Sequence, residues 1–114
     1  AAIGEHGCPV LEKVPEVVWQ ACKRLEKENI SNVRMLEEDA RDLPELFAPG
    51  EVDRIYLNFS DPWPKSRHGK RRLTYRSFLA RYCQVLAPEG EIHFKTDNRA
   101  LFEFSLNEFA ALFR

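Results

Sequence analysis

Residues 55–65 read Ile55-Tyr56-Leu57-Asn58-Phe59-Ser60-Asp61-Pro62-Trp63-Pro64-Lys65. The β-branched and aromatic side chains at the start of this stretch are typical of a strand. The strand run ends at Asp61, where two nearby prolines restrict the backbone. A basic tract, residues 65–72, follows at once. One strand end therefore offers a carboxylate, an aromatic ring and a cluster of positive charge, which suits holding a nucleic acid and acting on one base.

The residues on either side alternate between helix and strand patterns. Apolar side chains recur at helical spacing from Val17 to Leu25 and from Phe78 to Leu86. The predicted helices cover residues 15–28, 75–86 and 100–113, with one or two helical turns at 43–47. The predicted strands cover residues 9–11, 33–36, 53–60 and 91–96. We also expect Thr74 to cap the second long helix, and residues 88–90 to form a turn.

This alternation predicts an α/β fold with parallel strands. Ligands of open parallel sheets bind outside the carboxyl ends of the strands. Three of the predicted strands are followed by an acid, namely Asp39, Asp61 and Asp97. In a parallel sheet these three carboxylates would stand along one edge. The sequence therefore predicts a site at that edge.

The composition is that of one small, soluble domain. The chain has 114 residues, of which 44% are hydrophobic and 31% charged, and its net charge is −1. No apolar run reaches the ~20 residues that a membrane helix needs, and the first residues do not form a signal peptide. We therefore expect no membrane partner and a cytoplasmic location.

The cysteines and histidines argue against a disulfide framework and against a metal site. Cys8, Cys22 and Cys83 are odd in number and far apart, which favours a reduced chain. We expect Cys22 and Cys83 to be small core residues of helices. The three histidines show no metal-ligand spacing, so we expect no metal.

Each candidate site residue also has a purely structural interpretation. Asp61 is a common kind of turn residue before proline, and Trp63 is either a stacking platform or a buried ring. Asp39 and Asp97 could each belong to a helix cap. Glu12, which ends the first predicted strand, is either a ligand for ribose hydroxyls or an ordinary surface residue.

The basic tract is either a solvated run of charge or a phosphate-binding segment. Lys and Arg side chains contribute sequence-independent affinity for phosphates, and they position a nucleic acid more than they read it. Gly69 and the small residues between the charges suit a flexible arm. Because the tract directly follows Asp61, we favour phosphate contact.

Two motifs carry a family resemblance. The first runs from Ile55 to Lys65 and continues through Arg67-His68 and Lys70-Arg71-Arg72-Leu73-Thr74. The second is Ile92-His93-Phe94-Lys95-Thr96-Asp97-Asn98. Together with Ile30-Ser31-Asn32-Val33 and Asp39-Ala40, they closely resemble the bacterial tRNA (guanine-N7-)-methyltransferases of the TrmB type. The resemblance covers about Leu11 to the end of the chain.

This resemblance implies a Rossmann-like class I methyltransferase fold, a mostly parallel sheet flanked by helices. It implies S-adenosylmethionine as methyl donor and a guanine in the tRNA variable loop as acceptor. Asp61 looks like the catalytic acid and also like a cofactor contact. The other implied cofactor contacts are Glu12, Asp39 and Ala40. The implied substrate-binding residues are Lys65 and Asp97. The implied RNA-binding residues are Arg67, His68, Lys70, Arg71 and Arg72.

Two parts of the family pattern have no counterpart in this sequence. They are the glycine-rich cofactor loop after the family's first strand and a T-x-x-E motif near its carboxyl end. That first strand would stand between the strands that carry Glu12 and Asp61. We therefore expect an incomplete sheet, and residues 1–114 to be part of a methyltransferase domain, with residues 1–10 outside the resemblance. The oligomeric state, monomer or homodimer, stays open.

Two other functions also stay open. A catalytically inactive RNA-binding fragment would keep the basic tract without a complete cofactor site. A methyltransferase acting on an exocyclic amine would use an Asp-Pro-Pro-Tyr type of loop. Trp63 stands where that loop has its second proline, and the basic tract follows, so this interpretation is weaker.

Overall fold

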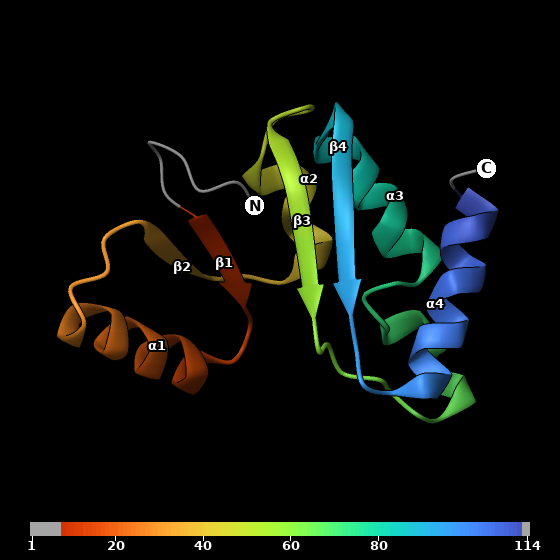
Figure 1. The fold of residues 1–114 in the computed structure, drawn as a ribbon, viewed down its shortest axis with the longest axis horizontal. Coiled ribbons are helices and arrows are strands. Elements are labelled where there is room, and N and C mark those ends of the chain that lie inside the picture. The colour runs from red at the N-terminus through yellow and green to blue at the C-terminus, as the bar shows by residue number, and fades with distance from the viewer. Residues whose placement is uncertain (1–7, 113–114) are drawn as a thin grey trace.

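The computed structural model describes residues 8–112, in which helices and strands alternate (Figure 1). The strands are β1 (Cys8–Glu12), β2 (Val33–Glu37), β3 (Val52–Asn58) and β4 (Leu86–Lys95). The α-helices are α1 (Pro15–Lys27), α2 (Leu43–Leu46), α3 (Arg76–Val85) and α4 (Arg99–Leu112). Two 3₁₀ helices complete the order, η1 (Ala40–Asp42) before α2 and η2 (Ser66–Arg71) before α3.

All the strand pairing is parallel within this part of the chain. β1 pairs with β2, and Glu12 lies opposite Glu37 at the end of that ladder. β3 pairs with β4, and Asn58 lies opposite Lys95. The strand arrows run the same way in Figure 1, so the carboxyl ends of β1, β3 and β4 lie toward one end of the molecule. The predicted α/β fold with parallel strands is confirmed.

The two strand pairs do not join into one sheet. Within residues 8–112, β1–β2 and β3–β4 are separate two-stranded sheets, and β1 makes no ladder with β3. The expected sheet is therefore incomplete between these two strands, as the sequence predicted.

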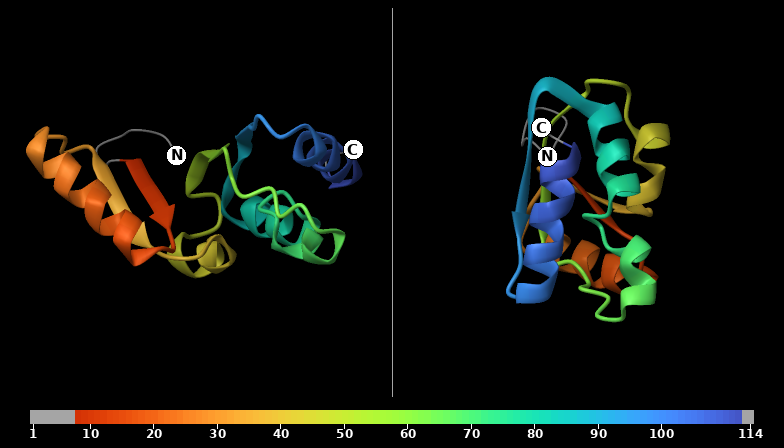
Figure 2. Two further views of the ribbon diagram at one scale, coloured as in Figure 1. Left: turned by 90° about the horizontal axis from the view of Figure 1, so that it is seen from below. Right: turned by 90° about the vertical axis from the view of Figure 1, so that its right-hand side faces the viewer.

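The core lies between β3 and the helices that cover one face of the β3–β4 pair (Figure 2). Its buried residues are Leu43, Leu57, Leu79, Tyr82 and Val85. Leu79 and Tyr82 are completely inaccessible to solvent, as expected for the apolar stripe of α3. Leu11 of β1 also packs against this cluster, which connects the two sheets.

Helix α4 packs beside α3 and against β4. The Phe94 and Phe109 rings are 6.1 Å apart, which joins β4 to α4. Thr74 was expected to cap α3, and that prediction is wrong. Its hydroxyl instead lies 2.6 Å from Ser105 Oγ of α4, in a fully buried position. Tyr75 occupies the N-cap position and makes no side-chain cap bond.

The turn expected at residues 88–90 is also wrong, because these residues belong to β4. The β3–β4 register shifts here: Val52 lies opposite Leu86, whereas Arg54 lies opposite Glu91. The strand thus absorbs extra residues as an irregularity and does not reverse. Gly90 makes this close approach possible, since a Cβ there would lie 3.2 Å from the Asp53 carbonyl oxygen.

The apolar stripe of α1 is less buried than its pattern suggested. Val18, Ala21 and Leu25 are half-buried, and no residue of the helix is fully buried. Cys22 and Cys83 both lie in helices as predicted, but both are exposed, so their assignment to the core is wrong. None of the helices between residues 8 and 112 combines the length and apolar character that crossing a membrane requires.

Candidate active site beyond the strand ends

The four acids named from the sequence follow the carboxyl ends of four different strands. Glu12 is the last residue of β1, and Asp39 comes two residues after β2. Asp61 comes three residues after β3, and Asp97 two residues after β4. Because the strands within each pair are parallel, each pair contributes two acids to the same end of its sheet. This is the edge where open parallel sheets bind ligands.

Asp61 begins a tight loop, residues 61–64, that we call the Asp61 loop. Its Oδ1 accepts a hydrogen bond from the Trp63 backbone N–H at 3.0 Å, which closes a turn. Phe59 and Trp63 on either side have positive φ angles, 53° and 43°. Bulky side chains rarely adopt this region, so the loop stores backbone strain that its surroundings have to balance.

The basic tract forms the 3₁₀ helix η2, and the flexible arm expected around Gly69 is wrong. The ring of Trp63 accounts for part of this order. The Arg71 guanidinium lies 5.0 Å from the Trp63 ring centre, and the His68 ring meets it edge-on at 5.6 Å. Trp63 is thus half-buried among side chains of the tract.

The members of the basic tract differ in their contacts. Lys65, Arg67 and Lys70 are exposed, and none of their side chains makes a hydrogen bond or ion pair with another residue between 8 and 112. Arg72 is half-buried instead, and its guanidinium donates to the backbone carbonyls of Pro62 and Trp63. The sequence pattern does not reveal this difference, because all five positive residues of the tract look alike in it.

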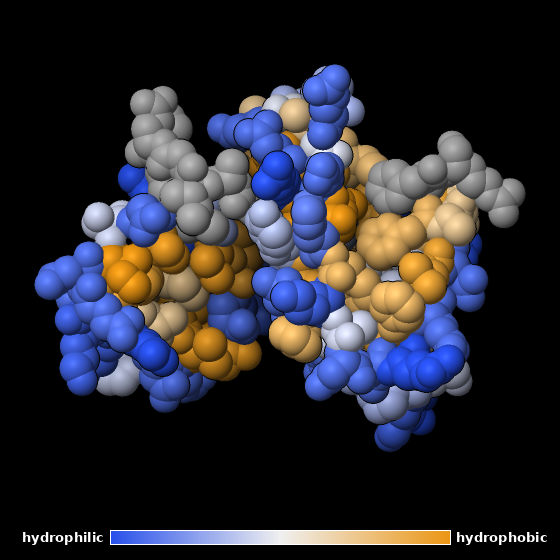
Figure 3. Space-filling model, viewed as in Figure 1, coloured by the Kyte–Doolittle hydropathy of each residue, from blue (hydrophilic) through white to orange (hydrophobic). Residues whose placement is uncertain are grey.

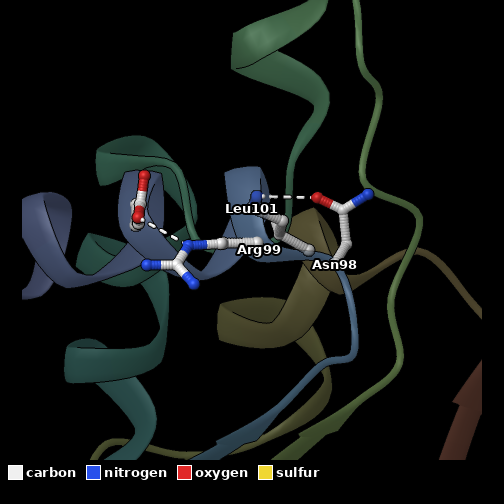
Figure 4. A network of polar contacts seen from close by, with 4 residues as sticks. Asn98, Arg99 and Leu101 are labelled. Carbon is white, nitrogen blue, oxygen red and sulfur yellow. Dashed lines mark hydrogen bonds and ion pairs between the residues drawn. The ribbon is translucent and has the colours of Figure 1, made fainter.

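Asn98 caps α4 (Figure 4), whereas no cap bond from Asp97 occurs among residues 8–112. Asn98 Oδ1 accepts from the Leu101 backbone N–H at 2.8 Å, the geometry of a helix N-cap. Arg99 pairs with Glu103 one turn further along the same helix, at 3.2 Å. Asp97 is exposed and makes no hydrogen bond or ion pair with another residue from 8 to 112. Its carboxylate therefore remains available to a ligand.

Asp39 caps η1, which Ala40 opens. Its Oδ1 accepts from the Arg41 backbone N–H at 3.0 Å, and its Oδ2 lies 3.9 Å from Arg41 Nε. Tyr82 is the buried neighbour of this region. Burial raises the pKa of the Tyr82 hydroxyl above its ordinary value, and the negative charge of Asp39 adds to the rise.

Glu12 closes the turn between β1 and α1. Its Oε1 accepts from the Val14 backbone N–H at 3.2 Å. The same local contact thus occurs at Glu12, Asp39 and Asp61. In each, one carboxylate oxygen accepts a hydrogen bond from the backbone N–H two residues further along the chain. In Glu12 and Asp61 the second oxygen has no hydrogen-bond partner among residues 8–112 and can accept from a ligand.

Neither a metal-binding cluster nor the cavity described next lies at this edge, among residues 8–112. A cavity of about 220 Å³ is lined by Leu86, Gly90, Ile92 and Phe109, toward the opposite end of β4. Between residues 8 and 112, no three His, Cys, Asp or Glu side chains are arranged to hold a metal ion. The candidate site is therefore an open edge of carboxylates beside a basic 3₁₀ helix.

Comparison with known proteins identifies a matching family and similar proteins. Residues 8–114 match the family Methyltransf_4, whose description reads "Putative methyltransferase". A protein of Brevibacillus brevis named tRNA (guanine-N(7)-)-methyltransferase is 60% identical over 101 residues, which are 89% of this chain and 47% of that protein. A Bacillus cytotoxicus protein of the same name is 54% identical over 100 residues, 88% of this chain and 46% of that protein. The chain thus spans about half the length of these relatives.

A solved structure shares the fold at much lower sequence similarity. Precorrin 8W decarboxylase of Methanobacterium thermoautotrophicum superposes with a TM-score of 0.68 at 16% identity. The superposition covers 94% of this chain and 51% of that one. At this identity the likeness concerns the fold alone. The resemblance inferred from the two sequence motifs is confirmed by the family match and the two relatives.

Proposed function

The chain belongs to the methyltransferase family Methyltransf_4, and from this premise we propose that its protein transfers a methyl group from S-adenosylmethionine to N7 of a guanine in the tRNA variable loop. The observation that carries the proposal is the Asp61 loop. It fixes a carboxylate beyond the end of β3, directly before a basic 3₁₀ helix. The fold is the Rossmann-like α/β arrangement of this family, and residues 8–114 are the part that the family match covers.

The acids of β1 and β2 suit the nucleoside part of S-adenosylmethionine. Glu12 is the last residue of β1, and Asp39 and Ala40 come just after β2, which pairs with β1 in parallel. At the ends of such strands a carboxylate commonly accepts from ribose hydroxyls or an adenine amino group. Glu12 Oε2 has no hydrogen-bond partner within residues 8–112, which suits a hydroxyl donor. When bound, this cofactor supplies an electrophilic methyl group on a sulfonium. Asp61 would lie close to it as well as to the base.

The proposed reaction does not require the protein to act as a general base. Guanine N7 carries a free lone pair, so no base has to remove a proton before the attack. The site has to hold the base in line with the methyl group. It also has to tolerate the positive charge that develops on the purine, which a fixed carboxylate stabilises. We assign this orienting and electrostatic role to Asp61.

The remaining site residues are assigned to the RNA. Asp97 would accept from the guanine N1–H and amino group, and its carboxylate is exposed and unpaired among residues 8–112. Lys65 would contact the substrate from the start of η2. The sequence motif implies an RNA-contacting segment of Arg67, His68, Lys70, Arg71 and Arg72, and we assign phosphate contact to its exposed members. Exposed Lys and Arg side chains of this kind attract phosphates by releasing counterions.

The proposed substrate also bears on location and partners. A tRNA substrate and the free thiols of Cys22 and Cys83 support a cytoplasmic location. Beyond the tRNA no partner is proposed, and both a monomer and a homodimer fit the site.

Two Asp61 variants of the full-length protein test the proposal. Asp61→Ala removes the charge and the turn acceptor, whereas Asp61→Asn removes the charge and keeps an oxygen for the Trp63 N–H. We expect both to reduce methyl transfer by about 100-fold or more, the size typical of lost electrostatic stabilisation. Transfer is measured with labelled S-adenosylmethionine on tRNA, and tRNA affinity by filter binding.

The matched control is Glu89→Gln, which neutralises an exposed acid in the amino-terminal half of β4. It should leave transfer unchanged. Absence of guanine N7 methylation by the unmodified protein would refute the proposed function. Intact tRNA binding in that case would favour the inactive RNA-binding alternative. An Asp61→Ala variant that loses tRNA affinity as much as transfer would contradict the assigned role.

A further inference from the structure

Arg72 makes a different set of contacts from the rest of the basic tract. Its Nε donates to the Pro62 carbonyl at 3.0 Å and to the Trp63 carbonyl at 3.2 Å. Its Nη2 donates to the same Trp63 carbonyl at 2.9 Å. A charged donor makes stronger hydrogen bonds than a neutral one, and these bonds are partly buried. One guanidinium therefore clamps two consecutive carbonyls of the Asp61 loop.

The guanidinium is itself held in place from the other side. Its central carbon lies 4.5 Å from the ring centre of Phe104 in α4. The Arg72 backbone N–H donates to the Gly69 carbonyl at the end of η2, and its carbonyl accepts from the Tyr75 N–H. Arg72 thus links the Asp61 loop to η2 and also to α4, which is distant in sequence.

The clamp acts where the loop is strained. Trp63 has a φ of 43°, a conformation that a bulky residue keeps only when its surroundings impose it. The backbone N–H of Trp63 donates to Asp61 Oδ1, and the carbonyl oxygen of Trp63 accepts from the Arg72 guanidinium. The orientation of the Asp61 carboxylate is therefore coupled, through one peptide unit on each side, to the Arg72 guanidinium.

We propose that Arg72 is a positioning residue for methyl transfer, which holds the Asp61 loop in the geometry that aims the Asp61 carboxylate at the reacting base. It takes no part in binding RNA phosphates, in contrast to the role that the sequence motif implied. Phosphate contact falls to the exposed side chains of the tract, such as Arg67 and Lys70. The inference rests on the proposed function, because the reaction that Asp61 serves is the one proposed above.

The chemistry of the side chain allows a direct test. A lysine keeps the positive charge of Arg72, but it lacks the planar fork that spans two carbonyls and stacks on Phe104. A phosphate contact would largely survive Arg72→Lys, whereas a clamp would not. Arg72→Met removes the charge and the fork together. The matched control is Lys70→Met, which neutralises an exposed member of the same tract.

The first measurements use full-length protein with tRNA. We expect Arg72→Lys and Arg72→Met both to lower the single-turnover rate at saturating tRNA by roughly 10- to 100-fold, the size expected for a misplaced reacting group. Their tRNA affinity and its salt dependence should change little. Lys70→Met should weaken tRNA binding, and its salt slope should fall by about 1. Lys27→Met, which neutralises an exposed residue of α1 outside the basic tract, should leave the rate and the tRNA affinity unchanged. A normal rate in Arg72→Lys, with weaker tRNA binding in Arg72→Met alone, would overturn the proposal.

A second measurement needs no catalysis. Fluorine NMR of protein labelled with fluorotryptophan reports the surroundings of the Trp63 ring, and its resonance is identified by its loss in Trp63→Phe. Arg72→Lys should shift and broaden this resonance, whereas Lys70→Met should not. An unchanged resonance in Arg72→Lys would overturn the clamp. This result stays decisive even where the unmodified protein does not methylate tRNA, which would refute only the proposed function and its link to Arg72.

Discussion

At the scale of single residues, a buried chain of hydroxyl groups joins the segment before α3 to α4. Thr74 and Ser105 are both completely inaccessible to solvent, and their side-chain oxygens are 2.6 Å apart. Ser105 Oγ also donates to the Leu101 carbonyl at 2.6 Å. The Ser105 hydroxyl therefore donates its hydrogen bond within α4, to the Leu101 carbonyl, and accepts a hydrogen bond from the Thr74 hydroxyl. The Thr74 hydroxyl therefore has a partner because Ser105 is present, whereas Ser105 also keeps its bond to the Leu101 carbonyl.

This arrangement predicts unequal and non-additive effects of its two members on stability. Ser105→Ala leaves the Thr74 hydroxyl buried without a partner, which should cost about 1–3 kcal/mol in the free energy of unfolding. Thr74→Val should cost less, since Ser105 keeps its bond to Leu101. The double variant should cost less than the sum of the two, because it leaves no orphaned hydroxyl. Urea unfolding of the four proteins measures the difference.

The control for this cycle is Ser77→Ala, which removes an exposed hydroxyl from α3. It should change the free energy of unfolding by less than about 0.5 kcal/mol. Strict additivity of Thr74→Val and Ser105→Ala would contradict the hydroxyl chain.

The same residues show what the sequence reveals at this scale. The turn at Asp61 is one of the two interpretations that the sequence offers for this residue, because two nearby prolines restrict the local backbone. The partner of Thr74 lies 31 positions away in the sequence, and the pattern before a helix looks the same whether the hydroxyl caps the helix or bonds elsewhere. The clamp formed by Arg72 was missed for the same reason, since it depends on the folded position of Phe104.

At the scale of elements, the irregular start of β4 decides how closely this strand approaches β3. Gly90 lies in a place where a Cβ would be 2.9 Å from Leu86 Cδ2 and 3.0 Å from the Ala87 carbonyl oxygen. The Asp53 carbonyl oxygen of β3 would be 3.2 Å away. Two of these neighbours are backbone atoms, which cannot rotate out of the way as a side chain can.

Gly90→Ala should therefore destabilise the protein by about 1–3 kcal/mol, the usual cost of forcing extra volume into a packed place. Gly69→Ala is the matched control, because its Cβ would meet only Arg72 Nη1 at 3.8 Å, an ordinary contact. Thermal unfolding followed by circular dichroism measures both. Equal midpoints for the two variants would show that the strand can relax around the added methyl group.

Most elements were predictable from pattern, and the exceptions have physical causes. The helices α1, α3 and α4 and the strands β2 and β3 lie within one or two residues of their predicted bounds, because each has a clear apolar period. The proline and glycine at residues 88–90 are typical of a turn, yet they lie in an irregular stretch of β4. The 3₁₀ helix η2 has no apolar stripe at all, and contacts of Arg71 and His68 with the Trp63 ring help to hold it in place.

At the scale of the whole molecule, the part formed by β1, α1 and β2 is less well packed than the rest. Its sheet is not joined to the β3–β4 sheet within residues 8–112, and α1 has no fully buried residue. Figure 3 shows apolar side chains on the surface over this part and beside α4. The exposed apolar residues of these regions include Val10, Val14, Val17, Phe102 and Leu106. The separation of the sheets follows from long-range strand order, which the local sequence pattern does not determine.

This difference in packing predicts that the two parts open separately. Leu11 connects β1 to the core, but few other buried contacts hold β1, α1 and β2 in place. In native-state hydrogen exchange of the 114-residue chain, backbone amides of α1 and of the β1–β2 ladder should exchange through local opening. Amides of β3, β4 and α3 should exchange only near the free energy of global unfolding, because they surround the core.

Leu79→Ala distinguishes local opening from uniform weakness. Leu79 is fully buried in the core, so its truncation should cost about 2–5 kcal/mol. Protection should fall by that amount at β3 and α3, where exchange follows global unfolding. Protection at α1 should hardly change, since its local opening does not break the Leu79 contacts. If amides of α1 lost as much protection as those of α3, the two parts would form one cooperative unit, and Leu11 and the few other contacts would couple them more strongly than their burial implies.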